Sequence, residues 1–74
     1  MIQANEREMT EVYHYGLAYT KTMKLLMWEV RTPTEIWRQL EDGKGIPPLA
    51  GYERGMRQAL KDYEEQNGVA GTDQ

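Results

Sequence analysis

The 74-residue sequence contains no cysteine and no phenylalanine, and it has a single histidine, His14. Without cysteine the chain forms neither disulfides nor thiolate metal sites, and its one histidine could hold zinc only if several carboxylates converged on it. A core in a chain of this size rarely contributes more than about 3–5 kcal/mol of stability. We therefore expect closely packed helices, self-association or a partner to complete the fold.

Long apolar runs and a targeting segment are also missing. The longest uninterrupted apolar run extends only from Leu25 to Trp28, whereas a membrane-spanning helix needs about 20 such residues. The N-terminus has neither the basic region nor the apolar stretch of a secretory signal peptide. Because the lack of cysteine is also compatible with a reducing compartment, we expect a cytoplasmic protein without a membrane partner.

The sequence does contain apolar residues at helical spacing, in three segments. The predicted helices have the bounds Glu6–Glu29, Pro33–Asp42 and Leu49–Gln66. We expect residues 5–67 to form one small all-α domain of three helices, with flexible termini at 1–4 and 68–74. Self-association of this domain is an alternative that the spacing leaves open.

Capping signals support these bounds. Asn5 followed by Glu8 predicts a capping box at the first helix, and Thr32-Pro33-Thr34-Glu35 is a capping box with proline at the first helical position. Gly43 supplies a stop for the second helix. In the connector that follows, Ile46 is apolar and is expected to reach the core.

The first predicted helix carries two apolar stripes. The main stripe, which steps by three and four residues and is expected to face the core or a partner helix, comprises Met9, Val12, Gly16, Tyr19, Met23, Leu26 and Val30. A second patch, Tyr13, Leu17 and Trp28, lies roughly 120–160° around the helix. Either the second helix covers this patch, or it stays exposed as a dimer or partner surface.

The third predicted helix carries a stripe of small residues, Gly51, Gly55 and Ala59. Since glycine inside a helix costs roughly 0.5–1 kcal/mol relative to alanine, this stripe indicates that another backbone comes close. We favour contact with the first helix near Gly16, with a docked partner as the alternative.

Basic residues occupy the opposite face of the third helix, at Arg54, Arg57 and Lys61. The final turn, from Asp62 to Glu65, is mostly acidic, and negative charge there opposes the helix dipole. We interpret this turn as a solvated end, with docking of a basic partner as the alternative.

No catalytic or cofactor-binding motif is recognisable in the sequence. No nucleophile is paired with a base, Gly43-Lys44-Gly45 is too short for a phosphate-binding loop, and no metal-ligand spacing occurs. His14, at the polar edge of the first helix, is expected to be simply exposed. We therefore expect a non-enzymatic protein without cofactor or metal.

These observations predict a protein-binding module that acts by steric occlusion. Its size and composition are typical of small accessory proteins of bacteria and their phages that inhibit or regulate a host protein. The expected partner-binding residues are an apolar anchor and three charged contacts: Tyr13, Leu17, Trp28, Arg54, Arg57 and Lys61.

The alternative is a DNA-binding regulator of the helix-turn-helix type. A short helix, a turn with glycine and a helix with a basic face follow that order. Three features count against it: the long turn from Gly43 to Pro48, the bulky Trp37 in the second helix, and the acidic residues beside the bases. The net charge of −3 also disfavours charge-driven binding of nucleic acid.

Overall fold

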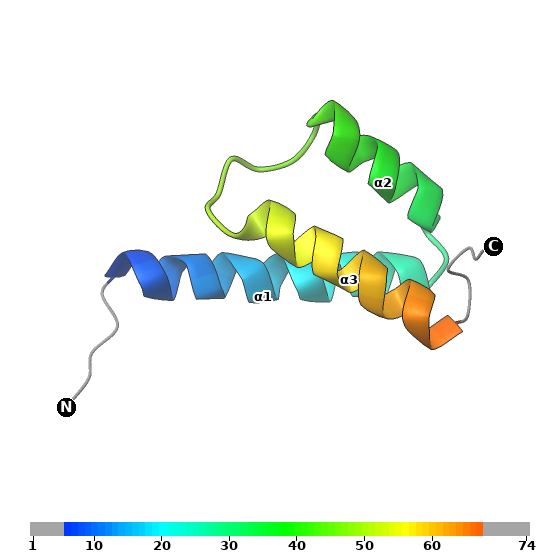
Figure 1. Ribbon diagram of the computed structural model, residues 1–74, viewed down its shortest axis with the longest axis horizontal. Coiled ribbons are helices and arrows are strands. Elements are labelled where there is room, and N and C mark those ends of the chain that lie inside the picture. Colours follow the sequence, from blue (N-terminus) through cyan, green and yellow to red (C-terminus); the bar gives the residue numbers. More distant parts are fainter. Residues whose placement is uncertain (1–5, 68–74) are drawn as a thin grey trace.

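The computed structural model describes residues 6–67, which form three α-helices: α1 (Glu6–Met27), α2 (Pro33–Asp42) and α3 (Tyr52–Asn67). In Figure 1, α3 crosses the long α1, and a loop joins α3 to α2. α3 packs against both other helices, whereas α1 and α2 contact each other little. The predicted all-α architecture of three helices is confirmed. The predicted cap at Asn5 and the predicted termini at 1–4 and 68–74 lie outside the described residues.

The hydrophobic core lies along α3, which meets side chains of both other helices. Its members are Ala18, Leu26, Ile36, Leu40, Tyr52, Met56 and Leu60. Ile46, in the loop between α2 and α3, packs against this core, as do Trp37 and Tyr63. The predicted inward position of Ile46 is therefore confirmed, and α3 is the central element of the fold.

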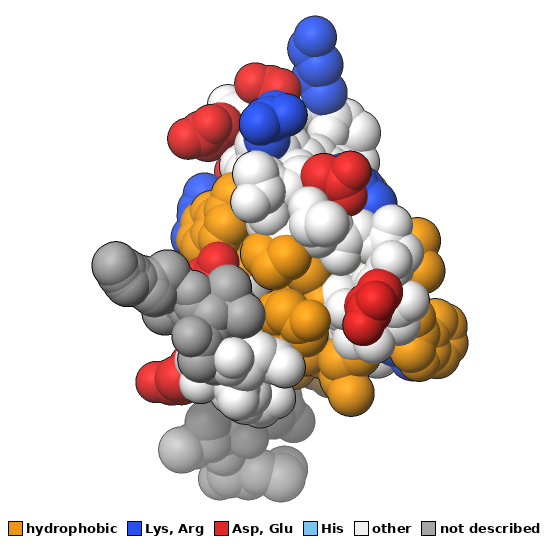
Figure 2. All heavy atoms as spheres, turned by 90° about the vertical axis from the view of Figure 1, so that its right-hand side faces the viewer, with side chains coloured by type: hydrophobic (Ala, Val, Ile, Leu, Met, Phe, Trp, Pro, Cys, Tyr) orange, Lys and Arg blue, Asp and Glu red, His pale blue; other side chains and the backbone are white. Residues whose placement is uncertain are grey.

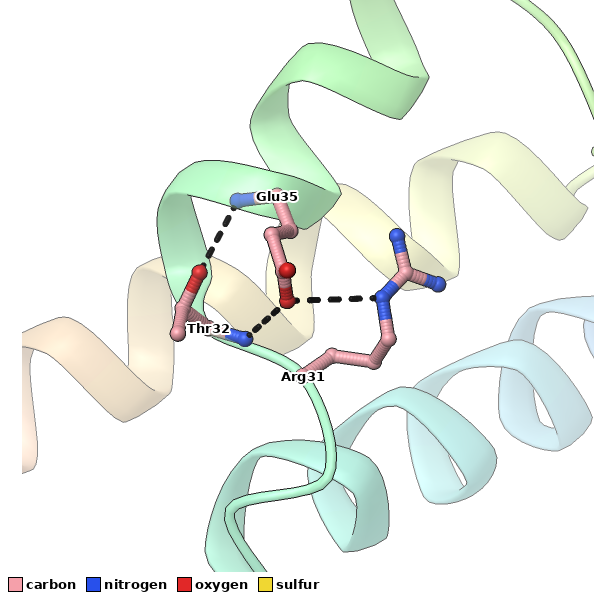
Figure 3. A network of polar contacts seen from close by, with 3 residues as sticks. All are labelled: Arg31, Thr32 and Glu35. Atoms are coloured by element: carbon pink, nitrogen blue, oxygen red, sulfur yellow. Dashed lines mark hydrogen bonds and ion pairs between the residues drawn. The ribbon is translucent and has the colours of Figure 1, made fainter.

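The N-terminus of α2 is held by the predicted capping box, which Figure 3 shows. The Glu35 amide donates to the Thr32 hydroxyl oxygen at 3.2 Å, and the Thr32 amide donates to the Glu35 carboxylate at 2.9 Å. Arg31 lies 3.6 Å from the same carboxylate. At the other end, Gly43 adopts a φ of +72° and donates to the Gln39 carbonyl. Both predicted bounds of α2 are confirmed.

α1 and α3 approach each other backbone to backbone at Gly55. A Cβ atom at this position would overlap the carbonyl oxygen of Tyr15 and would lie 3.0 Å from the Ala18 Cβ. Only glycine fits in this space. The close packing of the two helices offsets the cost of a glycine inside a helix. The predicted intramolecular contact between the first and third helices is confirmed.

Gly51 precedes α3 and is not part of it, which corrects the predicted helical start at Leu49. Its φ of +92° is a left-handed conformation that side chains rarely adopt. A Cβ at Gly51 would also lie 2.5 Å from the Glu11 carbonyl oxygen. The chain therefore turns at Gly51 directly against α1, and α3 begins at Tyr52.

α1 ends at Met27, two residues before its predicted end, in a Schellman arrangement. The Val30 amide donates to the Leu25 carbonyl and the Glu29 amide donates to the Leu26 carbonyl. Glu29 occupies the left-handed position with a φ of +58°, where glycine is usual. The left-handed conformation costs a residue with a Cβ about 1 kcal/mol. Since the position holds glutamate and not glycine, no local sequence signal marks this helix end.

Only part of the main apolar stripe predicted for the first helix faces the core: Leu26 is buried in it, and the Tyr19 hydroxyl bonds to Asp62 of α3. Met9, Val12 and Val30 are exposed, and a Cβ at Gly16 would have no atom within 4 Å. The face that packs on α3 combines the predicted Leu26 with Ala18 and Thr22, which the stripe did not include, and all three are buried. Small side chains at Ala18 and Thr22 suit a close helix crossing, whereas larger ones would hold the helices apart.

Candidate protein-interaction surfaces

The outer face of α1 is defined here by Met9, Val12, Tyr13, Gly16 and Leu17. Met9, Val12 and Tyr13 are 61%, 70% and 66% exposed. Tyr13 lies about 140° around the helix from Ala18, on the side that α3 does not cover. α2 packs on α3, so it does not cover this face either. Large apolar side chains at neighbouring helical positions are unusual on a solvated surface.

Trp28 lies apart from this outer face. It follows the last residue of α1, and helical rise places it about 16 Å from Leu17 along the axis. Together with Met27 and Val30 it is more than half exposed. Figure 2 shows apolar side chains at this end of the molecule, below charged side chains near α2. The structure therefore exposes all three residues of the predicted anchor but divides them between two surfaces.

The predicted basic residues line a hollow between α1 and α3. Arg54, Arg57 and Lys61 surround a space of about 280 Å³, together with Gln58 and Tyr15. The structure thus brings the three predicted charged contacts together. Tyr15, which no sequence signal indicated, supplies the wall from α1 and stacks on Tyr19 with ring centroids 6.4 Å apart.

A second hollow of about 220 Å³ adjoins the first and shares two of its lining residues, Tyr15 and Arg54. Val12, Glu11 and Gly51 complete it. We call the two hollows together the seam groove, since they follow the contact between α1 and α3. This groove joins the outer face of α1, at Val12, to the basic residues of α3.

The acidic residues of α3 bind other helices and are not simply a solvated end. Asp62 accepts hydrogen bonds from the Tyr19 hydroxyl at 2.5 Å and from Gln58 Nε2 at 2.9 Å. Glu64 accepts one from Trp37 Nε1 at 3.2 Å. Asp62 therefore ties α3 to α1, and Glu64 ties it to α2. The interpretation of this turn as solvated is corrected, although Glu65 is exposed.

The Tyr19–Asp62 hydrogen bond shifts the pKa of both groups. It lowers the pKa of Asp62 below its ordinary value, and Gln58 lowers it further. The same bond raises the pKa of Tyr19 above its ordinary value of 10.0, and desolvation of the hydroxyl makes a smaller contribution in the same direction. Both shifts favour the neutral phenol and the ionised carboxylate, which is the pairing that joins α1 to α3.

We expect this pairing to impose a pH window on stability. The contribution of Asp62 is present above its ordinary pKa of 3.8 and is lost as the pH falls through its lower folded pKa. The contribution of Tyr19 is present below pH 10.0 and is lost as the pH rises through its higher folded pKa. Urea unfolding between pH 2 and 11 measures both limbs. Tyr19→Phe should flatten the alkaline limb, whereas Tyr13→Phe, at an exposed position, should leave it unchanged.

Most of the cations in the seam groove are not paired with a carboxylate among the described residues. Arg57 lies 3.5 Å from Glu53, with both side chains about half exposed, and such a pair exchanges readily for another partner. Arg54 and Lys61 form no ion pair among the described residues. Asp62, the acid next to Lys61 in sequence, accepts hydrogen bonds from Tyr19 and Gln58 and forms no ion pair with Lys61.

A larger hollow beside α2 provides the contrast. Its volume is about 420 Å³, and its lining combines three cations with two carboxylates, Glu35 and Asp42. Arg31 there is paired with Glu35 at 3.6 Å. The basic part of the seam groove has no acid among its lining residues, so it is the stronger candidate for binding an anionic group.

His14 is half-buried and not simply exposed, which corrects its predicted position. Its Nδ1 lies 3.3 Å from the Ala50 carbonyl oxygen, and its ring meets Tyr13 edge to face. It therefore joins α1 to the turn before α3. In the part of the chain that the structure describes, no three potential ligands converge as a metal site.

No helix within residues 6–67 is long and apolar enough to cross a membrane. Comparison with family models, curated proteins and solved structures found no match to this chain.

Proposed function

We propose that this chain is a small non-catalytic protein-binding module that inhibits or regulates another protein by covering part of its surface. The observation that carries the proposal is the outer face of α1, where Met9, Val12 and Tyr13 are all more than 60% exposed. Apolar side chains of this size are the kind that form the core of a protein interface when they are buried on docking. Tyrosine is also a residue type that often dominates binding energy.

Affinity capture from a lysate of the native host tests this proposal. The wild-type protein is compared with Val12→Ser/Tyr13→Ser and with Arg38→Ser/Glu41→Ser, which alters exposed residues of α2. We expect one protein to be captured by the wild type and the α2 variant, and to be depleted about tenfold with the outer-face variant. Equal capture by all three, with circular dichroism showing intact helices, contradicts the proposal.

A second copy of the chain is the alternative occupant of the outer face. Gly16 lies within that face with open space above it, so a second helix meets no side chain there. Sedimentation at several concentrations separates the two cases, because self-association makes the measured mass rise with concentration. We propose the monomer as the binding-competent form.

DNA binding is the second candidate function, and the cluster of Arg54, Arg57 and Lys61 favours it. The connection between α2 and α3, residues 43–51, is longer than the three- to four-residue turn of a helix-turn-helix. If each cation contacts one phosphate, the logarithm of affinity should fall with the logarithm of salt concentration with a slope near ~3. Absence of duplex binding at low salt removes this candidate.

A further inference from the structure

We propose that the seam groove binds an acidic segment of the partner protein, with apolar contact at Val12 and carboxylates along Arg54, Arg57 and Lys61. The inference rests on the proposed protein-binding function and adds the chemical class of the partner. Two observations lead to it: the two hollows share Tyr15 and Arg54 and extend from the exposed Val12 to the basic row, and no carboxylate lines the hollow that holds this row.

The spacing of the cations favours a segment with several carboxylates over one small anion. Arg54 and Lys61 are separated by about 10 Å along the axis of α3, with Arg57 between them. A segment with several carboxylates can meet each cation in turn, whereas a single carboxylate or phosphate would need all three side chains to converge on it. An acidic helix or extended segment lying along α3 presents charged groups at that repeat.

The surroundings of the groove favour a short acidic segment over nucleic acid. Glu11 lines the end nearest Val12, and Glu53 lies beside Arg57. Beyond Lys61, a neighbouring hollow is lined by Asp62, Glu64 and Glu65 among others. A long polyanion would extend over these carboxylates, whereas a compact segment ends before it reaches them. The net charge of −3 also repels a long polyanion at a distance, which again disfavours nucleic acid.

Tyr15 also suits a peptide ligand. It is half-buried at the junction of the two hollows and stacks on Tyr19, so its ring is held as a fixed wall. A rigid aromatic surface provides contact area at low entropic cost on binding. Its position between Val12 and Arg54 matches a segment in which an apolar side chain is adjacent to the acidic ones.

Fluorescence anisotropy with a labelled hexaglutamate peptide, in buffer of low ionic strength, tests the inference. The charge-removing variant is Arg54→Gln/Lys61→Gln. The matched control is Arg38→Gln/Lys44→Gln, which removes the same charge from the balanced hollow beside α2. We expect the first variant to weaken binding about fivefold and the control less than about twofold, since exposed ion pairs contribute modestly. A labelled hexathymidylate is titrated in parallel.

Three results would overturn the inference. They are absence of hexaglutamate binding, equal weakening by both variants, and tighter binding of hexathymidylate that depends on Arg54 and Lys61. Neither variant alters the outer face of α1. Capture of a protein that depends on the outer face of α1, without any binding of hexaglutamate, therefore removes this inference alone, and the proposed function stands.

Discussion

Gly55→Ala is expected to lower the free energy of unfolding by about 3 kcal/mol, the upper end of the usual cost of overpacking. The added Cβ would overlap the Tyr15 carbonyl oxygen, which is backbone and cannot rotate away. α1 and α3 would have to separate, and they form the largest helix contact in the fold. Since a core of this size supplies only about 3–5 kcal/mol, the variant should retain at most about 2 kcal/mol of stability.

Gly16→Ala is the matched control, because it makes the same change on the face of α1 that points away from α3. No atom lies within 4 Å of the position that its Cβ would occupy. This variant should be more stable than the wild type by about 0.5–1 kcal/mol, the helix-propensity gain of alanine. Urea unfolding followed by circular dichroism measures both variants. Similar effects at the two glycines would contradict the described packing of α1 on α3.

Leu26→Ala is the second large effect, with an expected loss of about 2–5 kcal/mol. Leu26 is 1% exposed and is among the largest fully buried side chains. Its truncation leaves a cavity among core residues from all three helices. We expect a shift of the thermal transition to far lower temperature, or loss of the cooperative transition.

Trp28→Ala, two residues further along the chain, removes a larger side chain and should change stability by less than about 0.5 kcal/mol. Trp28 is 70% exposed, so its removal opens no cavity. Thermal unfolding of both variants under one set of conditions makes the comparison. A loss for Trp28→Ala comparable to that for Leu26→Ala would place Trp28 in the core.

The parts of the fold that could be predicted are those encoded by neighbouring residues. The capping box at Thr32 and Glu35 and the stop at Gly43 each need only a few adjacent positions, and α2 has the predicted bounds. The close contact at Gly55 was also predictable, because an internal helical glycine is unfavourable unless something approaches it. The partner of that contact was not, since Gly16 was expected there and Tyr15 and Ala18 occupy it.

The inner face of α1 could not be identified from apolar spacing alone. Large residues such as Met9 and Val12 mark the stronger stripe, yet a crossing at backbone distance selects the small Ala18 and Thr22. Hydropathy ranks side chains by transfer energy and not by the separation that they impose between helices. The two tertiary hydrogen bonds to Asp62 and Glu64 join residues 43 and 27 positions apart, and no local pattern records them.

The candidate site was predicted in its residue types but not in its arrangement. Arg54, Arg57 and Lys61 share a helical face, so periodicity was sufficient to group them. The apolar residue next to them is Val12, a member of the stripe predicted to face the core or a partner helix, and Trp28 lies on a different surface. The junction at Tyr15 depends on how α1 crosses α3, which is a tertiary property.

The central claim is that α1 packs on α3 by one face and leaves its opposite face uncovered. Native-state oxidation of the methionines by hydrogen peroxide, followed by peptide mass spectrometry, tests it most directly. Met9 and Met27, which are 61% and 64% exposed, should react at rates close to those of the unfolded chain, whereas Met56, at 6%, should be strongly protected. Protection of Met9 equal to that of Met56 would show that the outer face is covered, and would contradict the claim.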